Sequence, residues 1–500
     1  MPGEELYQQY ITKMRRIADV KNTLAVMQWD QETYLPPKGA ELRGEQMATL
    51  SEIAHEMFAE EELGKLLRQL SEIKALPILQ QRNVELTLED YNKNKKYSAA
   101  FVRKLSEATS RSYHSWVEAR RQNNFGLFKK ELGELVALKK EEAYILGFEK
   151  HPYDAVLNEY EKGATVEWLN GLFNQLKQPL KDLLTAILQK APPADAFLHQ
   201  HFDKDKQWSF GLEVLKKMGY DFEAGRQDIS AHPFTTSFNA HDVRITTRID
   251  ENDFTYMTWS CIHEGGHALY EQGLPVEAYG LPAGEFCSLG IHESQSRLWE
   301  NCIGRSMAFI EGNYPLMQQY FPGLHRVTAA ELYRAVNKVQ PSLIRTEADE
   351  LTYHFHVMIR YDVEKKLIEG SLPVEDIPAC WNEMYKQYLG VDVPNDAQGC
   401  LQDIHWSHGS FGYFPTYSLG SLYAAQFLAY IQQQNTDLPS QIAAGDYNSI
   451  HQWLKENIYR YGRIYTSDEL CNKATGEPLQ LQYFMEYVRT KYADIYQLPK

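Results

Sequence analysis

The chain has 500 residues, of which 43% are hydrophobic and 24% are charged, the balance of an ordinary globular protein. That much apolar content can form a large core, which excludes disorder as the main state. The formal net charge of −16 argues against a general binder of nucleic acid or anionic membranes, because such partners need clustered cations. We therefore expect neither nucleic acid nor a membrane as a partner.

The N-terminus and the cysteines predict a cytoplasmic location. The first residues lack the apolar run of a signal peptide, and no apolar stretch approaches the ~20 residues of a membrane span. Six cysteines are scattered along the chain without a Cys-x-x-Cys pair, which excludes thiolate zinc ribbons and thioredoxin-like motifs. Scattered thiols are typical of a reducing compartment.

Residues 1–230 predict a succession of helices. Apolar side chains recur at helical spacing in residues 41–59, and residues 101–150 are rich in Lys, Glu, Ala and Leu, all good helix formers. Prolines separate these segments at Pro36-Pro37, Pro77, Pro152 and Pro192-Pro193.

Residues 234–249 break the helical pattern. Phe234–Phe238 and Val243–Ile249 alternate with period two on either side of Asn239–Asp242, a sequence typical of a turn. We therefore expect a β-hairpin here, followed by helices to the C-terminus.

The domain organisation follows from this pattern rather than from length. Five hundred residues suggest about three domains of ~150 residues each. No linker of low complexity separates the segments, so we expect one mainly α-helical domain over residues 1–500, with a small β-sheet. It has a helical N-terminal half, residues 1–230, and its chemical motifs lie in residues 232–420.

The strongest chemical signal is His263-Glu264-Gly265-Gly266-His267. Two histidines four residues apart lie on one helix face, so both imidazoles can bind one Zn²⁺. Glu264 lies about a quarter turn away and can act as a general base toward water. The alternative is a pair of buried structural histidines.

The surroundings of the motif support a helix packed in a core. Asp253 is a candidate N-cap and Gly273 a natural stop, with apolar residues at helical spacing between them. Because Gly265 and Gly266 lack Cβ atoms, another backbone or a substrate can come close to this helix.

A catalytic zinc needs a third protein ligand and an open fourth position. Glu293 follows His267 at a distance that leaves room for one loop and a returning helix. Glu285 and Glu300 are the competitors. We prefer Glu293 because polar neighbours, including Arg297, can hydrogen-bond a ligating carboxylate.

Six motifs follow one another along the chain. They are His232-Pro-Phe234, Asp242-Val-Arg-Ile-Thr246, His263-Glu-Gly-Gly-His267, His292-Glu-Ser-Gln295, Ile344-Arg-Thr-Glu-Ala-Asp349 and Gly399-Cys-Leu-Gln-Asp-Ile-His-Trp406. Together they resemble the signature of the carboxypeptidase Taq family of zinc metallocarboxypeptidases. Many zinc peptidases share the third motif, whereas the last is far more particular to this family.

The resemblance implies a fold and an activity. The fold is a large helical ellipsoid with a deep active-site groove, similar to neurolysin and angiotensin-converting enzyme. The activity is release of single C-terminal residues from peptides, with broad specificity but poor action at C-terminal proline. His263, His267 and Glu293 would bind Zn²⁺, which Co²⁺ can replace, Glu264 would be the catalytic base, and the protein would be a homodimer.

Two further sets of residues are candidates for the reaction. The tetrahedral oxyanion needs a donor besides the metal, and Tyr413, Tyr417 and His405 are candidates because related helical peptidases use a tyrosine and a histidine there. A guanidinium can bind a free C-terminal carboxylate bidentately. Arg345 is the first candidate because the family uses its motif in this role, and Arg244 is the second. The alternative for Arg345 is an ion pair with Asp349.

Two other functions remain open at this point. A helical zinc oligopeptidase that cuts internal bonds shares the metal motif, and a non-catalytic helical protein can retain a zinc ion. The motifs at Ile344–Asp349 and Gly399–Trp406 favour the carboxypeptidase.

Overall fold

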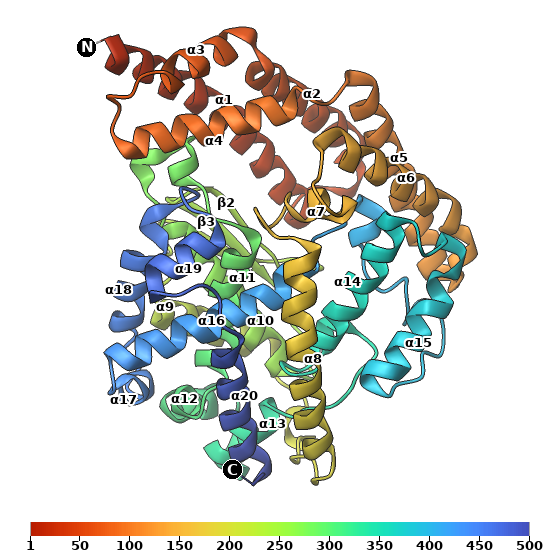
Figure 1. Cartoon of the computed structure of the whole chain (residues 1–500). Helices are drawn as coiled ribbons and strands as arrows, with labels where there is room; N and C mark the ends of the chain where they lie inside the picture. Colours follow the sequence, from red (N-terminus) through yellow and green to blue (C-terminus); the bar gives the residue numbers. More distant parts are fainter. Residues whose placement is uncertain (1, 500) are drawn as a thin grey trace. The chain divides into compact units, whose positions relative to one another are not determined.

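The structure is a computed structural model of the chain, and it describes residues 2–499. Its elements are α-helices with one small β-sheet (Figure 1), which confirms the predicted mainly helical class. The chain folds into two compact units. Unit 1 comprises Met1–Lys95, Ala194–Val336 and Tyr423–Leu479, and unit 2 comprises Lys96–Pro193, Asn337–Leu422 and Gln480–Lys500. The single domain over residues 1–500 stays a prediction.

Unit 1 contains the sheet and the helices around it. Its helices are α1 (Pro2–Thr33), α2 (Ala40–Ala59), α3 (Glu61–Ser71), α4 (Ile78–Asn94), α9 (Lys204–Met218), α10 (Phe254–Gln272), α11 (Leu289–Arg297), α12 (Met307–Tyr320), α13 (Ala329–Val336), α17 (Leu438–Ala443), α18 (Asn448–Asn457) and α19 (Ser467–Thr475). A π-helix, η6 (Leu298–Gly304), continues directly from α11.

Unit 2 consists of helices and loops, with no strand among its described residues. Its helices are α5 (Ala99–Gln122), α6 (Lys129–Leu146), α7 (Pro152–Leu157), α8 (Val166–Leu188), α14 (Tyr353–Glu369), α15 (Ile377–Leu389) and α20 (Leu481–Tyr496). The helix α16 (Pro415–Gln434) begins in the chain segment of unit 2 and ends in that of unit 1.

The sheet confirms the predicted hairpin and adds one strand. β2 (Thr235–Asn239) and β3 (Asp242–Thr247) pair antiparallel, and β1 (Gly225–Ile229) pairs in parallel with the other edge of β3. The sequence pattern missed β1 because its buried side chains are the polar Gln227 and Asp228, which leave no apolar alternation.

The helix α10 is the centre of unit 1. Asp253 caps it by accepting a hydrogen bond from the backbone N–H of Thr255, and Gly273 ends it, as the sequence predicted. Trp259 and Ile262 are buried, and the helix packs against β2, β3, α9 and α11. This packing fixes the helix that carries the two histidines of the motif.

The helix α14 is the most buried helix described in unit 2, as α10 is the central helix of unit 1. Almost all of its side chains from Tyr353 to Ile368 are buried, and it packs against α6, α7 and α15. Its buried side chains include the charged residues Arg360 and Glu364, so this helix also places ionisable groups in a core.

The length and polarity of the helices bear on whether any of them could lie in a bilayer. Among residues 2–499, none combines the length with the apolar character needed to cross a membrane.

Candidate metal centre and arginine–histidine cluster

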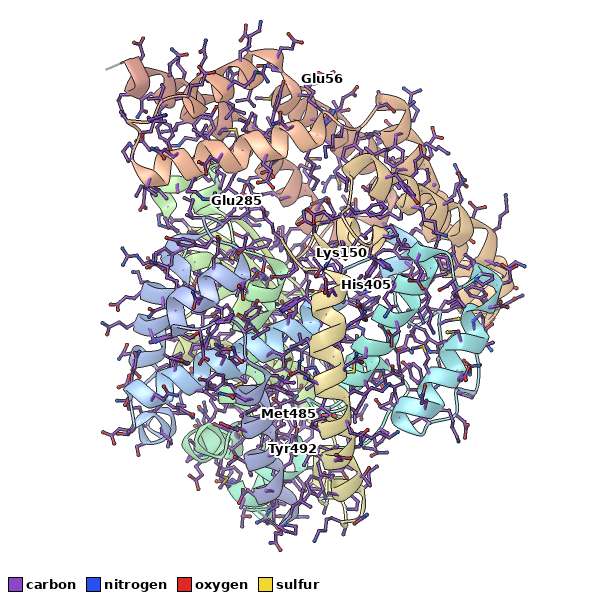
Figure 2. All side chains as sticks on the ribbon, viewed as in Figure 1. Glu56, Lys150, Glu285, His405, Met485 and Tyr492 are labelled. Atoms are coloured by element: carbon purple, nitrogen blue, oxygen red, sulfur yellow. The ribbon has the colours of Figure 1, made fainter. Side chains whose placement is uncertain are left out.

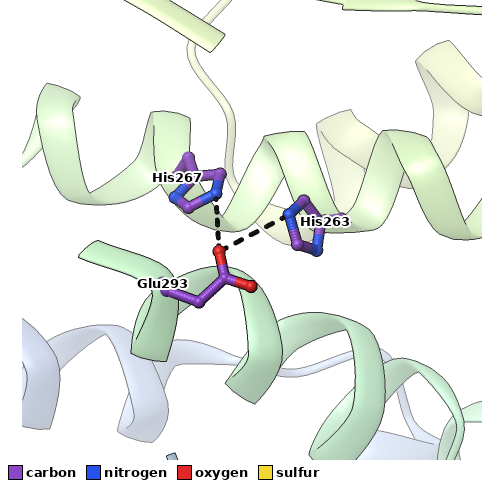
Figure 3. A group of neighbouring side chains, drawn as sticks. All are labelled: His263, His267 and Glu293. Atoms are coloured by element: carbon purple, nitrogen blue, oxygen red, sulfur yellow. Dashed lines mark ion pairs between the residues drawn. The ribbon is translucent and has the colours of Figure 1, made fainter. Parts of the chain in front are cut away.

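Two histidines on α10 face a glutamate on α11 (Figure 3). Nε2 of His267 lies 3.4 Å from Oε2 of Glu293, and Nε2 of His263 lies 3.8 Å from the same oxygen. Two ligands ~2.1 Å from one ion at tetrahedral angles are about 3.4 Å apart. Each residue offers one donor atom within 4.8 Å of the other two, so the three fit a shared metal ion.

A glycine permits this approach of the two helices. A Cβ atom at Gly266 would lie 2.7 Å from the carbonyl oxygen of Gln295 and 2.8 Å from Cα of Ser296. This confirms, for Gly266, the expectation that a glycine of the motif lets another backbone come close. At Gly265 a Cβ would instead meet the side chain of Leu215 at 2.7 Å.

A second carboxylate orients one of the histidines. Nδ1 of His263 lies 2.8 Å from Oε2 of Glu300, and this contact orients the ring so that Nε2 is the nitrogen nearer Glu293. Glu300 was a competitor for the third ligand, but it contacts the ring nitrogen away from Glu293. Glu285, the other competitor, is half exposed and pairs with Arg463.

Arginines hold both carboxylates. Nε of Arg297 donates to Oε1 of Glu293 at 2.7 Å, and its Nη1 lies 3.4 Å from Oε2 of Glu300. Arg305 approaches Oε1 of Glu300 at 3.5 Å. Glu300 and Arg305 are five residues apart, and the π-helix η6 allows this contact because its turns close at i→i+5.

These contacts determine the charges of the site. Burial lowers the pKa of His263, but Glu293 and Glu300 outweigh it and raise this pKa to about 9. Burial raises the pKa of Glu293, yet Arg297 and His263 hold it well below its usual range. Burial raises the pKa of Glu300 as well, but His263 and Arg297 lower it to about 2, so both carboxylates are ionised.

The second histidine is oriented differently. Burial and the neighbouring His292 lower the pKa of His267 to about 3, so its imidazole is neutral, as a metal ligand must be. Its ring stacks on that of His292 with centroids 4.4 Å apart, and His292 Nε2 lies 2.9 Å from Oε1 of Glu271. Nδ1 of His267 is buried without a hydrogen-bond partner among residues 2–499.

Glu264 lies beside the ligands with its carboxylate fixed from the sheet. Oγ1 of Thr235, on β2, donates to Oε2 of Glu264 at 2.6 Å. Burial raises the pKa of Glu264, which makes its carboxylate a better proton acceptor. We call His263, His267, Glu293, Glu264, Glu300 and Arg297 the metal centre.

The remaining catalytic candidates gather in unit 2. Nε2 of His405 (labelled in Figure 2) lies 3.2 Å from the hydroxyl of Tyr417, and the ring of Tyr413 lies 5.2 Å from each of theirs. Burial and the charge of Arg345 lower the pKa of His405 to about 3, so its imidazole is neutral.

Arg345 is buried against a carboxylate in the same unit. Its Nε donates to Oδ1 of Asp403 at 2.9 Å, and Nη1 donates to the hydroxyl of Tyr353 at 2.7 Å. Asp403 also accepts from Nε of Arg360 at 2.7 Å, so two guanidinium groups share one carboxylate. The expected alternative partner, Asp349, instead accepts hydrogen bonds from the start of α14. We call Arg345, Arg360, Asp403, His405 and Tyr417 the arginine–histidine cluster.

Arg244 lies on the sheet of unit 1. It forms two hydrogen bonds with Asp242, at 2.8 and 2.9 Å, and its guanidinium lies 4.3 Å from the ring centroid of Trp29. The fork of this arginine is therefore already engaged by a carboxylate of its own strand.

Comparison with known proteins places the chain in a family. The model of the carboxypeptidase Taq (M32) metallopeptidases matches residues 9–492. The chain belongs to this family. Carboxypeptidase 1 of Bacillus subtilis is 37% identical over 495 residues, covering 98% of each chain.

Solved structures agree with this assignment. The M32 carboxypeptidase from Deinococcus radiodurans R1 is 40% identical, with a TM-score of 0.97 and coverage of 99% of this chain and 100% of that one. A solved structure of a protein named CHT is 60% identical, covering 98% and 99% of the two chains with a TM-score of 0.96. The predicted family is confirmed, and the chain is a metallocarboxypeptidase, which is a peptide hydrolase.

Several residues that contact the candidate site residues were not predicted from the sequence. Thr235, which fixes Glu264, gave no signal because it contacts the motif only through the sheet. The role of Glu300 had a signal, since it follows Glu293 by two helical turns and so lies on the same face. Arg360 and Glu364 were indistinguishable from surface charges of a helix.

Proposed function

We propose that the chain is a zinc carboxypeptidase that releases single C-terminal residues from peptides, with broad specificity and poor action at C-terminal proline. The observation that carries this proposal is the set of His263, His267 and Glu293 donors around one point, with Glu264 beside it. Membership of a metallocarboxypeptidase family supports it.

Zinc is the metal that we infer, with Co²⁺ as a substitute. Two imidazole nitrogens and one carboxylate oxygen form the usual protein set of a catalytic zinc and leave one position of a tetrahedron open. Zinc bound there would lower the pKa of a water ligand toward ~7 and polarise the scissile carbonyl.

Glu264 is the proton carrier in this proposal. Its carboxylate accepts a proton from the attacking water and then gives it to the leaving amine. Its raised pKa and its hydrogen bond from Thr235 suit both steps, since the group must accept and release one proton from a fixed position.

Tyr417, Tyr413 and His405 are the proposed donors to the oxyanion. Tyr417 is the first choice because His405 lies at its hydroxyl and the guanidinium of Arg345 lies 4.9 Å from its ring centroid. Donors fixed before the reaction are the ones that stabilise developing charge most.

Arg345 is the proposed receptor of the substrate's C-terminal carboxylate, with Arg244 as the second candidate. Nε and Nη2 of Arg345 lie on Asp403 and Nη1 on Tyr353, so N–H groups on Nη1 and Nη2 remain for another acceptor. Arg244 donates to Asp242 through Nε and Nη2, so by the same count it also keeps N–H groups for another acceptor.

The assembly and the location are part of the same proposal. We propose a homodimer, which light scattering on the purified protein tests directly. We also propose a cytoplasmic location, supported by the six cysteines, which are all free thiols. Cell fractionation tests it.

One pair of peptides distinguishes the exopeptidase from the alternative zinc endopeptidase. The peptides share a sequence, and one ends in a free carboxylate whereas the other ends in an amide. We expect stepwise loss of single residues from the free peptide by mass spectrometry, dependent on metal, and little reaction of the amide. Equal cleavage of both peptides at internal bonds would overturn the proposal.

A further inference from the structure

A fully buried carboxylate lies in unit 2 outside the arginine–histidine cluster. Glu364, on α14, accepts hydrogen bonds from the hydroxyl of Tyr153 at 2.5 Å, from Nε1 of Trp406 at 2.8 Å and from the backbone N–H of Gly412 at 2.8 Å. All three donors are neutral. A buried carboxylate without an ion-pair partner is costly, and apolar residues fill a core at lower cost.

Two of these donors are the ends of one segment. Trp406 follows His405 directly, and Gly412 directly precedes Tyr413. One carboxylate therefore fastens both ends of residues 406–412. Gly412 has a φ of +91°, and a Cβ there would lie 2.8 Å from the carbonyl oxygen of Val156, so the segment has little freedom at this end.

The same helix also fastens the chain before His405. One helical turn from Glu364, Arg360 donates to Asp403 through Nε at 2.7 Å and to Oε1 of Gln402 through Nη2 at 2.8 Å. The helix α14 thus fixes the residues on one side of His405 with a guanidinium and those on the other side with a carboxylate.

We propose that Glu364 is a positioning residue that sets the distance between His405 and Tyr417 by fastening both ends of residues 406–412 to α14. This inference rests on the proposed function, because it assumes that His405 and Tyr417 act on the substrate. Their 3.2 Å separation is the quantity that Glu364 maintains.

The charge of Glu364 gives this role a recognisable signature. Burial raises its pKa to about 7, against the opposing effects of Tyr153, Gly412, Trp406 and Arg360, and Tyr160 is a further titratable neighbour. The ionised group accepts from all its donors. A proton on it competes with them, so the positioning is present above pH ~7 and is lost as pH falls through that value.

Glu364→Gln tests this role, because the amide has the same shape but one oxygen and no charge. At about pH 8 we expect kcat on a peptide with a free C-terminus to fall about 30-fold with little change in KM, since small displacements of reacting groups cost such factors. The ratio of wild-type to variant kcat should shrink toward one below about pH 6, because Glu364 of the wild type is then protonated and as uncharged as the amide. Taking a ratio removes titrations that both proteins share.

Glu350→Gln is the matched control. Glu350 is another buried carboxylate of unit 2, and Nζ of Lys491 lies 2.7 Å from it. We expect this variant to lower the melting temperature while its activity ratio stays near one at every pH. If Glu364→Gln does not fold, Tyr153→Phe removes one donor and should lower kcat about threefold with the same pH dependence.

A ratio that does not vary with pH, or a change in KM alone, would overturn the positioning role while leaving the carboxypeptidase intact. Absence of C-terminal release by the wild type would overturn the proposed function, and the role of Glu364 with it.

Discussion

The metal centre and the arginine–histidine cluster are built from opposite charges in different ways. In the metal centre, Glu293 and Glu300 each contact an arginine on one side and a histidine of α10 on the other. In the cluster, two guanidinium groups share the carboxylate of Asp403. Glu364, one helical turn from Arg360 on α14, accepts hydrogen bonds from neutral donors. We propose that the first binds a metal ion and the second an anion, although both are buried. Burial alone therefore does not indicate what a site binds; the residues that contact each charged group do.

Glu264→Gln makes the sharpest test of the metal centre. We expect kcat to fall about 10³-fold or more, because the amide cannot accept a proton, while the metal content stays unchanged. Activity assays with elemental analysis check both. Glu277→Gln, on an exposed turn, is the control that should keep full activity. Unchanged activity of Glu264→Gln would remove the base from the mechanism and favour a non-catalytic zinc protein.

Arg345→Lys tests the cluster in the same manner. The lysine keeps the charge on Asp403 but lacks the fork, so we expect KM for a free C-terminus to rise about 100-fold. The preference for the free peptide over its amide should shrink with it. Arg244→Lys is the comparison, with an expected change below about threefold. The opposite ranking would make Arg244 the carboxylate receptor.

Glu300→Gln examines how the metal centre depends on its supporting charges. The amide still accepts from Nδ1 of His263, but without a charge, so we expect metal affinity to fall about 10- to 100-fold. Competition with a chelator measures it. Glu285→Gln should leave the affinity unchanged, and a loss there equal to that of Glu300→Gln would contradict the assigned contact.

Thr235→Val should give the smallest effect. It removes the hydroxyl that fixes Glu264, and we expect kcat to fall about tenfold with unchanged metal content. Thr236→Val is the matched control, since neighbouring strand residues point to opposite faces. Equal losses in the two variants would show that the sheet, rather than the hydroxyl, matters.

The grouping of His263, His267 and Glu293 could be predicted because these residues obey local rules. His263 and His267 are one helical turn apart, and Glu293 needed only a loop and a returning helix. The helix limits at Asp253 and Gly273 were also readable, since capping depends on the adjacent residues. The hairpin was found through its alternation, whereas β1 was not, because its inner face is polar.

The hydrogen-bond partners within the arginine–histidine cluster could not be predicted from the sequence, for a physical reason. Arg345, Arg360 and Asp403 come from three separate segments, and no spacing relates them. Glu364 has the spacing of an ordinary helix charge, and only its burial among Tyr153, Trp406 and Gly412 marks it. The family resemblance pointed to single residues and not to their partners. The spacing suggested an ion pair between Arg345 and Asp349, whereas Arg345 pairs with Asp403, 58 residues further along the chain.

The absence of a side chain at Gly266 has a further consequence. Metal–ligand distances tolerate deviations of about 0.2 Å, and a zinc ligand lies ~2.1 Å away whereas a calcium ligand lies ~2.4 Å away. A methyl group at this position would lie 2.7 and 2.8 Å from backbone atoms of Gln295 and Ser296, so α10 and α11 would have to move apart. Gly266 therefore limits how far Glu293 lies from His263 and His267, although it contributes no side chain to the site.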